Sequence, residues 1–170
     1  MIAFIELNTN IINIINKYYN KNNAMLFILY NDGICISQNI NNSSNINFYI
    51  PKSELNNYII NETISFILKE DIKNLNQIKI FKEKTKFLVN NKYCDILRPS
   101  CNFCKNICDL SDDVFVSCTK ELLLDIDLGW LNDILIDEMD NVKFIYNKDL
   151  NGFYIKKYDH INFYINFLIE

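Results

Sequence analysis

The sequence holds few of the residues on which catalytic and nucleotide-binding motifs depend. Among its 170 residues are three glycines, one histidine and one arginine. With so few glycines, a loop whose backbone closely approaches a phosphate is scarcely available. No nucleophile elbow or paired-carboxylate motif is present, and a lone histidine between strand-like segments, as His160 is, is more often structural or exposed than a general base. We therefore predict that the protein is not an enzyme and has no cofactor.

Long apolar runs and a basic leader segment are missing as well. No stretch approaches the roughly 20 apolar residues of a membrane span, and the first residues, MIAFIELN, contain no basic region. We expect a soluble, intracellular protein without a membrane partner. The net charge of -4 and the pI of about 5.1 give no overall basic footprint, so any contact with nucleic acid must come from a local patch.

What the sequence does have is 49% hydrophobic and 14% aromatic residues, which is typical of an ordered globular protein. The order strand, helix, hairpin, strand, helix and closing strands runs through it twice. A first helix is expected over residues 10–21 and a hairpin at Asp32-Gly33, and a second helix is expected over 69–77.

In the second copy, residues 101–111 and 129–139 can be helical, while 113–119 and 121–127 look like the two strands of a hairpin. Pro99 disfavours helix in the residue before it. We therefore predict a first domain over residues 1–98 and a shorter second domain over residues 99–170.

The cysteines raise the question of a metal site. Cys101, Cys104 and Cys108 are spaced i, i+3, i+7 and share one side of a helix. A zinc site usually pairs one CxxC motif with a second CxxC or an HxxxH motif, and here there is one CxxC. Cys94, Cys118 or the distant His160 could complete a set with these three, but cysteine also packs as a small buried hydrophobe. We favour core packing over zinc, and in an intracellular protein we expect the six cysteines to be reduced.

Several segments together resemble the sliding clamp family of DNA replication, of the type known as proliferating cell nuclear antigen. Residues 1–36 are similar to the opening strand, first helix and first hairpin of that family, with the run GICI at the turn. Residues 53–78 are similar to an aromatic stretch, strand and second helix. SCNFCKNICDLSDDVFVSCTKE, residues 100–121, resembles the start of the second domain, and residues 142–170 resemble the closing strands.

The resemblance implies an α+β fold of two domains, with helices on the concave side of antiparallel sheets. It implies a polymerase processivity factor that binds duplex DNA without sequence preference and tethers DNA polymerase or other replication proteins. Such a protein would be nuclear, or cytoplasmic if it comes from a virus that replicates there. Phosphate contacts involve no base readout. The lysines that would contact DNA phosphates are Lys17, Lys21, Lys69, Lys73 and Lys105. Partner docking would use Asn45, Ile46, Phe167, Leu168 and Ile169.

The sequence also departs from the family. It is much shorter, and the second domain is abridged between its first hairpin and its second helix, where the family has strands that close the ring. The usual trimeric ring is therefore in doubt, and a monomer, a homo-oligomer or a hetero-oligomer stays open. An alternative function is a clamp-derived interaction subunit of a replication or late-transcription complex that binds proteins and does not encircle DNA.

Overall fold

The structure is a computed structural model that describes residues 2–20, 22–68, 77–83, 86–89, 92–97, 116–148, 151–155, 158 and 161–167. In chain order its elements are β1 (Ala3–Glu6), α1 (Thr9–Tyr18), β2 (Met25–Tyr30), β3 (Gly33–Asn39), β4 (Asn45–Pro51), the 3-10 helix η1 (Lys52–Glu54), β5 (Asn57–Ile60), β6 (Ile64–Leu68), β7 (Gln77–Glu83), β8 (Lys86–Val89), β9 (Lys92–Leu97), β10 (Val116–Ser117), α3 (Lys120–Leu124), α4 (Leu131–Glu138), β11 (Phe144–Asn147), β12 (Gly152–Ile155) and β13 (Asn162–Asn166).

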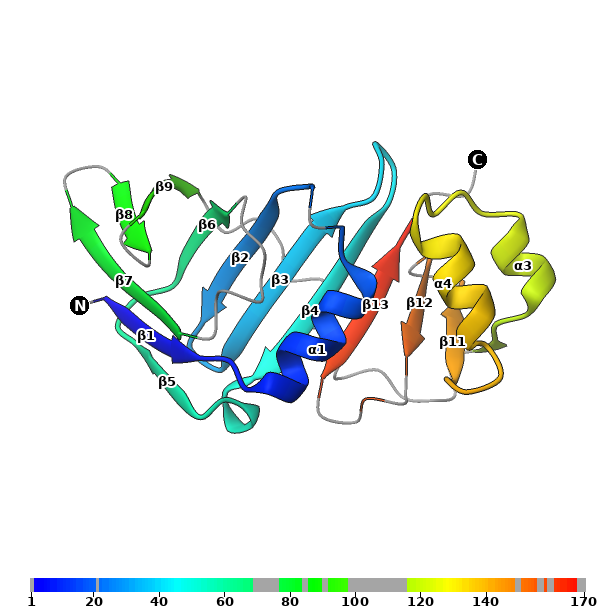
Figure 1. Ribbon diagram of the computed structural model, residues 1–170, viewed down its shortest axis with the longest axis horizontal. Helices are drawn as coiled ribbons and strands as arrows, with labels where there is room; N and C mark the ends of the chain where they lie inside the picture. Colours follow the sequence, from blue (N-terminus) through cyan, green and yellow to red (C-terminus); the bar gives the residue numbers. More distant parts are fainter. Residues whose placement is uncertain are drawn as a thin grey trace.

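The strands form two antiparallel sheets. One has the order β5-β1-β7-β8-β9, and the other has the order β10-β11-β12-β13-β4-β3-β2-β6. Two residue pairs between β6 and β9 join them. Helices α1, α3 and α4 lie on the same face of the strands (Figure 1), so the predicted α+β arrangement is confirmed. The predicted boundary at residues 98 and 99 lies outside the described residues and stays a prediction.

Helix α1 begins where the sequence predicts a helix because Asn8 caps it. The Asn8 side chain accepts a hydrogen bond from the backbone N–H of Ile11, at 2.9 Å, which satisfies one of the unpaired donors of the first turn. Its amide also donates to the carbonyl of Glu54 at 3.1 Å. Ile11, Ile12, Ile15 and Tyr18 are buried, so the apolar side of the helix faces the sheet.

The prediction of a strand over residues 121–127 is wrong, because helix α3 covers most of this stretch. The Thr119 hydroxyl accepts from the backbone N–H of Leu122 at 3.2 Å, and Leu123 is fully buried. A short apolar run fits a buried helix as well as a strand, and here the threonine cap decides. Strand β5 was not predicted. Of the helix expected over 69–77, residues 69–76 lie outside the described residues and Gln77 begins β7, and the helix expected over 101–111 lies outside them entirely.

Asn132 fastens α3 to α4 through three hydrogen bonds. Its amide donates to the carbonyls of Leu123 and Ile126, at 3.1 and 2.8 Å. Its carbonyl oxygen accepts from the backbone N–H of Leu128 at 2.6 Å. Three backbone groups in the connection between two short helices are therefore satisfied by one side chain.

The main core lies between the sheets and the helices. Phe48 of β4 and Phe163 of β13 stack at 4.7 Å between ring centroids, and the Tyr18 ring lies 4.5 Å from that of Phe163. A second buried cluster consists of Ile28, Tyr30, Cys35 and Tyr49.

Cys35 is disulfide-bonded, so the expectation that all cysteines are reduced is wrong for this residue. No described helix is long and apolar enough to span a membrane.

Gly152 is required by close packing between β12 and β13. A Cβ atom at this position would overlap the Tyr164 hydroxyl oxygen and the backbone carbonyl oxygen of Ile165. The Tyr164 side chain is fully buried, so its ring has little freedom to move away.

We predict that Gly152→Ala lowers the free energy of unfolding by about 1–3 kcal/mol, the usual cost of overpacking. In a Tyr164→Phe background the decrease should be smaller, because the hydroxyl oxygen nearest the new methyl group is gone. Urea unfolding measures both, and Asn42→Ala, in an exposed loop, should change stability by less than about 0.5 kcal/mol. An unchanged unfolding midpoint for Gly152→Ala would contradict this packing.

Candidate functional site

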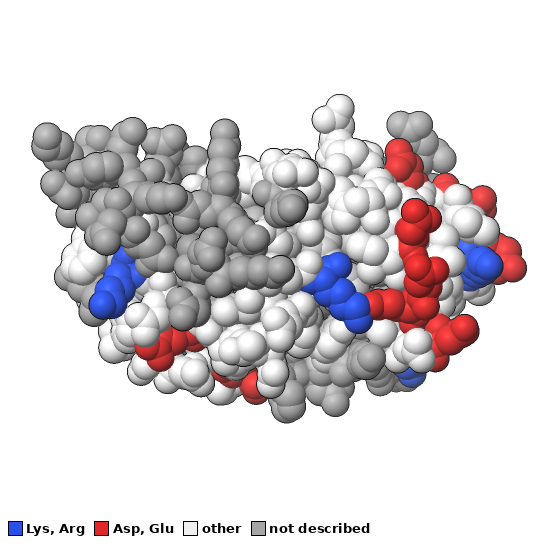
Figure 2. Space-filling model, viewed as in Figure 1, with Lys and Arg blue, Asp and Glu red and all other residues white. Residues whose placement is uncertain are grey.

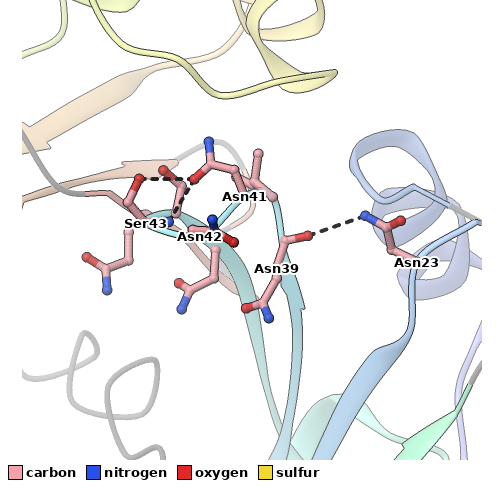
Figure 3. Close-up of a pocket in the computed structure, with 9 residues that line it drawn as sticks. Asn23, Asn39, Asn41, Asn42 and Ser43 are labelled. Carbon is pink, nitrogen blue, oxygen red and sulfur yellow. Dashed lines mark hydrogen bonds between the residues drawn. The ribbon is translucent and has the colours of Figure 1, made fainter.

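A polar pocket of about 550 Å³ lies beside the loop between β3 and β4 (Figure 3). Its lining comes from the turn after α1, from the hairpin loop and from the last residue of β13. The lining residues are Asn23, Asn39, Ile40, Asn41, Asn42, Ser43, Ser44, Asn45 and Asn166. We call this the asparagine pocket. None of these side chains is charged, and eight of the nine can form hydrogen bonds.

The hairpin loop is held by its own hydrogen bonds. The Asn41 side-chain oxygen accepts from the backbone N–H of Ser43 at 2.9 Å and from its hydroxyl at 3.1 Å, which is the Asx-turn geometry. The backbone N–H of Ile40 donates to the carbonyl of Ser44 at 2.9 Å. The Asn41 amide also donates to the carbonyl of Asp127, at 3.1 Å, so the loop is tied to the connection between α3 and α4.

The opposite wall is fixed by Gln38, which is 3% exposed. Its amide donates to the carbonyls of Asn20 and Asn23, at 2.7 and 3.1 Å, and its oxygen accepts from the Asn20 backbone N–H at 2.8 Å. The Asn23 side chain reaches toward the carbonyl of Asn39 (Figure 3). The pocket is therefore built on a fixed turn and a fixed hairpin.

Of the predicted partner-docking residues, only Asn45 lines this pocket. It pairs with Asn166 at the last position of the β4–β13 ladder. The side chains of Ile46 and Phe167 are 1% and 0% exposed, so they pack in the core and offer no surface. Leu168 and Ile169 lie outside the described residues. Sequence reasoning missed the other asparagines of the pocket because an Asn-rich run is also typical of ordinary loops.

Of the predicted DNA-contacting lysines, the structure describes Lys17 alone. It lies in the last turn of α1 and forms an ion pair with Glu138 at the end of α4. The hydrogen bond to Glu138 raises the pKa of Lys17 above its usual value. The other four lie outside the described residues: Lys21, Lys69, Lys73 and Lys105.

A cluster of polar contacts surrounds this ion pair. The Tyr18 hydroxyl donates to Glu138 Oε2 at 2.6 Å and lies 3.1 Å from the Tyr158 hydroxyl. Trp130 Nε1 donates to the backbone carbonyl of Tyr18 at 2.8 Å. Burial, together with the bond to Glu138, raises the pKa of Tyr18 well above its usual value. No signal in the sequence connects these residues, since they are 112 to 140 positions apart.

The charge on the helix-bearing face is uneven. Residues 116–148 carry seven carboxylates and three lysines, so their net charge of -4 equals that of the whole chain and the rest is balanced. Figure 2 shows acidic side chains gathered over the α3 and α4 side of this face. The carboxylates are those of Glu121, Asp125, Asp127, Asp133, Asp137, Glu138 and Asp140.

Within the described part of the chain, no group of three or more His, Cys, Asp or Glu side chains is placed to hold a metal ion. Cys94 is buried, at 6% exposed. Cys118, another cysteine that could have completed a zinc site, has a pKa raised to about 12 by burial, so its thiol stays protonated at neutral pH. Cys101, Cys104 and Cys108 lie outside the described residues, and their role stays a prediction.

No protein-family model matches this sequence, and no curated protein matches it. Solved structures do match. The Helicobacter pylori beta clamp bound to a DNA ligase peptide has a TM-score of 0.50 and 11% identity, over 98% of this chain and 65% of that one. A. fulgidus PCNA, in a structure with the C-terminal region of FEN-1, has a TM-score of 0.49 and 10% identity, over 99% of both chains. The beta subunit of DNA polymerase III from Borrelia burgdorferi has a TM-score of 0.48 and 11% identity, over 99% of this chain and 65% of that one.

The fold is sliding-clamp-like, as the sequence resemblance implied, and the likeness to the Helicobacter pylori clamp carries this conclusion. This chain spans 65% of the length of that clamp. At 11% identity the likeness concerns the fold alone, because one fold serves many functions.

Proposed function

We propose that this chain is a non-catalytic, clamp-like subunit that tethers replication proteins by docking one of their peptide segments at the asparagine pocket. One observation carries the proposal: the pocket lies where the hairpin loop of the first half meets the end of β13, around Asn45. A clamp of similar fold, from Helicobacter pylori, is bound to a DNA ligase peptide. Tethering requires no catalytic residue.

The chemistry of the lining suits an extended peptide main chain. Each residue of such a chain presents one N–H donor and one C=O acceptor, and a carboxamide side chain can satisfy both. Six asparagines line the pocket, with Ile40 as the one apolar side chain. An anchor of the docked segment is therefore polar and uncharged, in contrast to the aromatic anchors common at protein interfaces.

A second candidate is contact with duplex DNA through the helix-bearing face, as in a processivity factor. It is favoured by the placement of α1, α3 and α4 on one face (Figure 1) and by the lysine cluster that the resemblance assigns to this side. The acidic side chains over α3 and α4 oppose it, since like charges repel phosphate. We therefore assign the proposed DNA contact to the first half of the chain.

We further propose that the chain does not close the usual trimeric ring. From Val116 to Phe144 the described chain passes from β10 through α3 and α4 to β11. Between β10 and α4 the described residues hold helix α3 and no strand, and the resemblance implies that the clamp family has ring-closing strands in this stretch.

We predict that native mass spectrometry finds the 20.1 kDa monomer as the main species of the purified protein. The reason is that the described residues between β10 and α4 offer no strand edge for the backbone pairing of a homotrimer. A clean homotrimer across a tenfold dilution series would contradict this.

The docking proposal is tested with overlapping peptides from the DNA polymerase and DNA ligase of the same genome, by fluorescence anisotropy. We predict that Asn42→Arg, which places a long charged side chain in the pocket lining, weakens binding of the best peptide by about tenfold, or about 1.4 kcal/mol. Asn22→Arg makes the same change at an exposed residue outside the lining and should have no effect. Equal weakening in the two variants, or no peptide bound by the parent protein, would reject docking at this pocket.

The DNA candidate is tested by the salt dependence of binding to a duplex of random sequence. We predict that the double variant Lys17→Glu and Lys21→Glu weakens binding and lowers the magnitude of the slope of log K against log salt, by about 0.9 for each phosphate that is no longer neutralised. Lys52→Glu with Lys148→Glu carries the same charge change outside α1, α3 and α4 and should leave the slope unchanged. If both pairs act alike, the effect is one of net charge and the helix face is not the DNA contact.

A further inference from the structure

The ion pair between Lys17 and Glu138 joins the two helices that belong to different halves of the chain. The side chain of Lys17 is 45% exposed and that of Glu138 is 14% exposed. The lysine therefore lies at the surface of the helix-bearing face, and the carboxylate lies beneath it.

Glu138 is held by a contact that does not involve the lysine. Its Oε2 accepts the Tyr18 hydroxyl at 2.6 Å, and its Oε1 faces the Lys17 ammonium. Tyr18 is itself fully buried, against Phe163, and Trp130 binds its backbone carbonyl. The carboxylate is thus fixed by the fold, whereas the lysine has a long flexible stem and an exposed head. Only the lysine can leave the pair without disturbing the core.

We propose that Glu138 is an intramolecular competitor for Lys17, which holds the ammonium group against α4 and withholds it from the phosphates of duplex DNA. This rests on the proposed DNA contact and adds a regulatory element to it. The Lys17 ammonium of this ion pair is exposed and therefore open to screening by salt, so a phosphate of high local charge density can displace the carboxylate. The ion pair therefore weakens the binding of Lys17 to DNA phosphate but does not prevent it.

The ion pair also explains why a helix-face lysine coexists with an acidic neighbour. Lys17 neutralises Glu138, a carboxylate at the end of α4, and while it does so it adds no net positive charge to the surface beside α1. The high pKa of Lys17 follows from the same interaction and keeps the group charged at any pH at which DNA binding is measured.

The test is duplex DNA binding by Glu138→Gln, with Asp137→Asn as the control. Both variants remove one negative charge from neighbouring positions of α4, and glutamine can still accept the Tyr18 hydroxyl. We expect Glu138→Gln to bind about two- to fivefold more tightly than Asp137→Asn, the range that one exposed ion pair supports. The magnitude of its salt slope should rise by about 0.9, for one additional phosphate neutralised. In a Lys17→Gln background the tighter binding should vanish.

A second readout does not depend on DNA. Acylation of Lys17 by an amine-reactive ester at pH 8, followed by peptide mass spectrometry, should be faster in Glu138→Gln than in Asp137→Asn, because removal of the carboxylate lowers the pKa of the amine. Equal DNA binding by the two variants, while the parent protein binds DNA, overturns the competition and leaves the proposed DNA contact intact. No DNA binding by any variant rejects the proposed contact and the competition with it.

Discussion

The pairing of β4 with β13 is the interaction on which the rest of the structure depends. Five consecutive residue pairs, from Asn162↔Tyr49 to Asn166↔Asn45, join segments more than 110 residues apart in the chain. Phe48 and Phe163, opposite each other in this ladder, stack under Tyr18 of α1. Cross-strand aromatic pairs of this kind stabilise a sheet beyond their buried area. Because the ladder fixes the register of the two halves, it also fixes where α1 meets α4 and where the hairpin loop meets the α3–α4 connection.

Both candidate surfaces follow from that register. The ladder ends at Asn45 and Asn166, and the hairpin loop extends beyond it, so the asparagine pocket opens where backbone pairing stops. On the helix side the same register brings Glu138 to the last turn of α1. A slip of two residues between β4 and β13 would keep every side chain on its own face of the sheet, yet it would separate these partners by more than the length of a hydrogen bond. The arrangement of residues on both surfaces is therefore a consequence of the pairing between β4 and β13.

The sequence predicts the first half well because its signals are local. The Asp32-Gly33 turn, the helical spacing of Ile11, Ile15 and Tyr18, and the alternating strands each depend on neighbours within a few residues. The second half is harder, because the apolar run at 121–127 is compatible with two structures and only the Thr119 cap selects the helix. The contacts of Glu138 with Lys17 and Tyr18 join residues about 120 positions apart, and no spacing rule predicts them. The sequence does not predict the asparagine pocket either. Its lining residues are typical of a polar loop, and only the position of β13 beside them creates the pocket.

The two halves of the helix-bearing face have different electrostatic roles. In a clamp that encircles DNA, both halves would have to present positive charge to a uniformly negative cylinder. Here the excess negative charge of the whole chain is confined to residues 116–148, and the one described lysine of α1 is held by a carboxylate of α4. A surface with this polarity fits the proposed phosphate contact with one half only, and it does not fit a ring in which both halves face the duplex. The uneven charge, and helix α3 in the stretch between β10 and α4, therefore both support the proposed one-sided subunit over a closed ring.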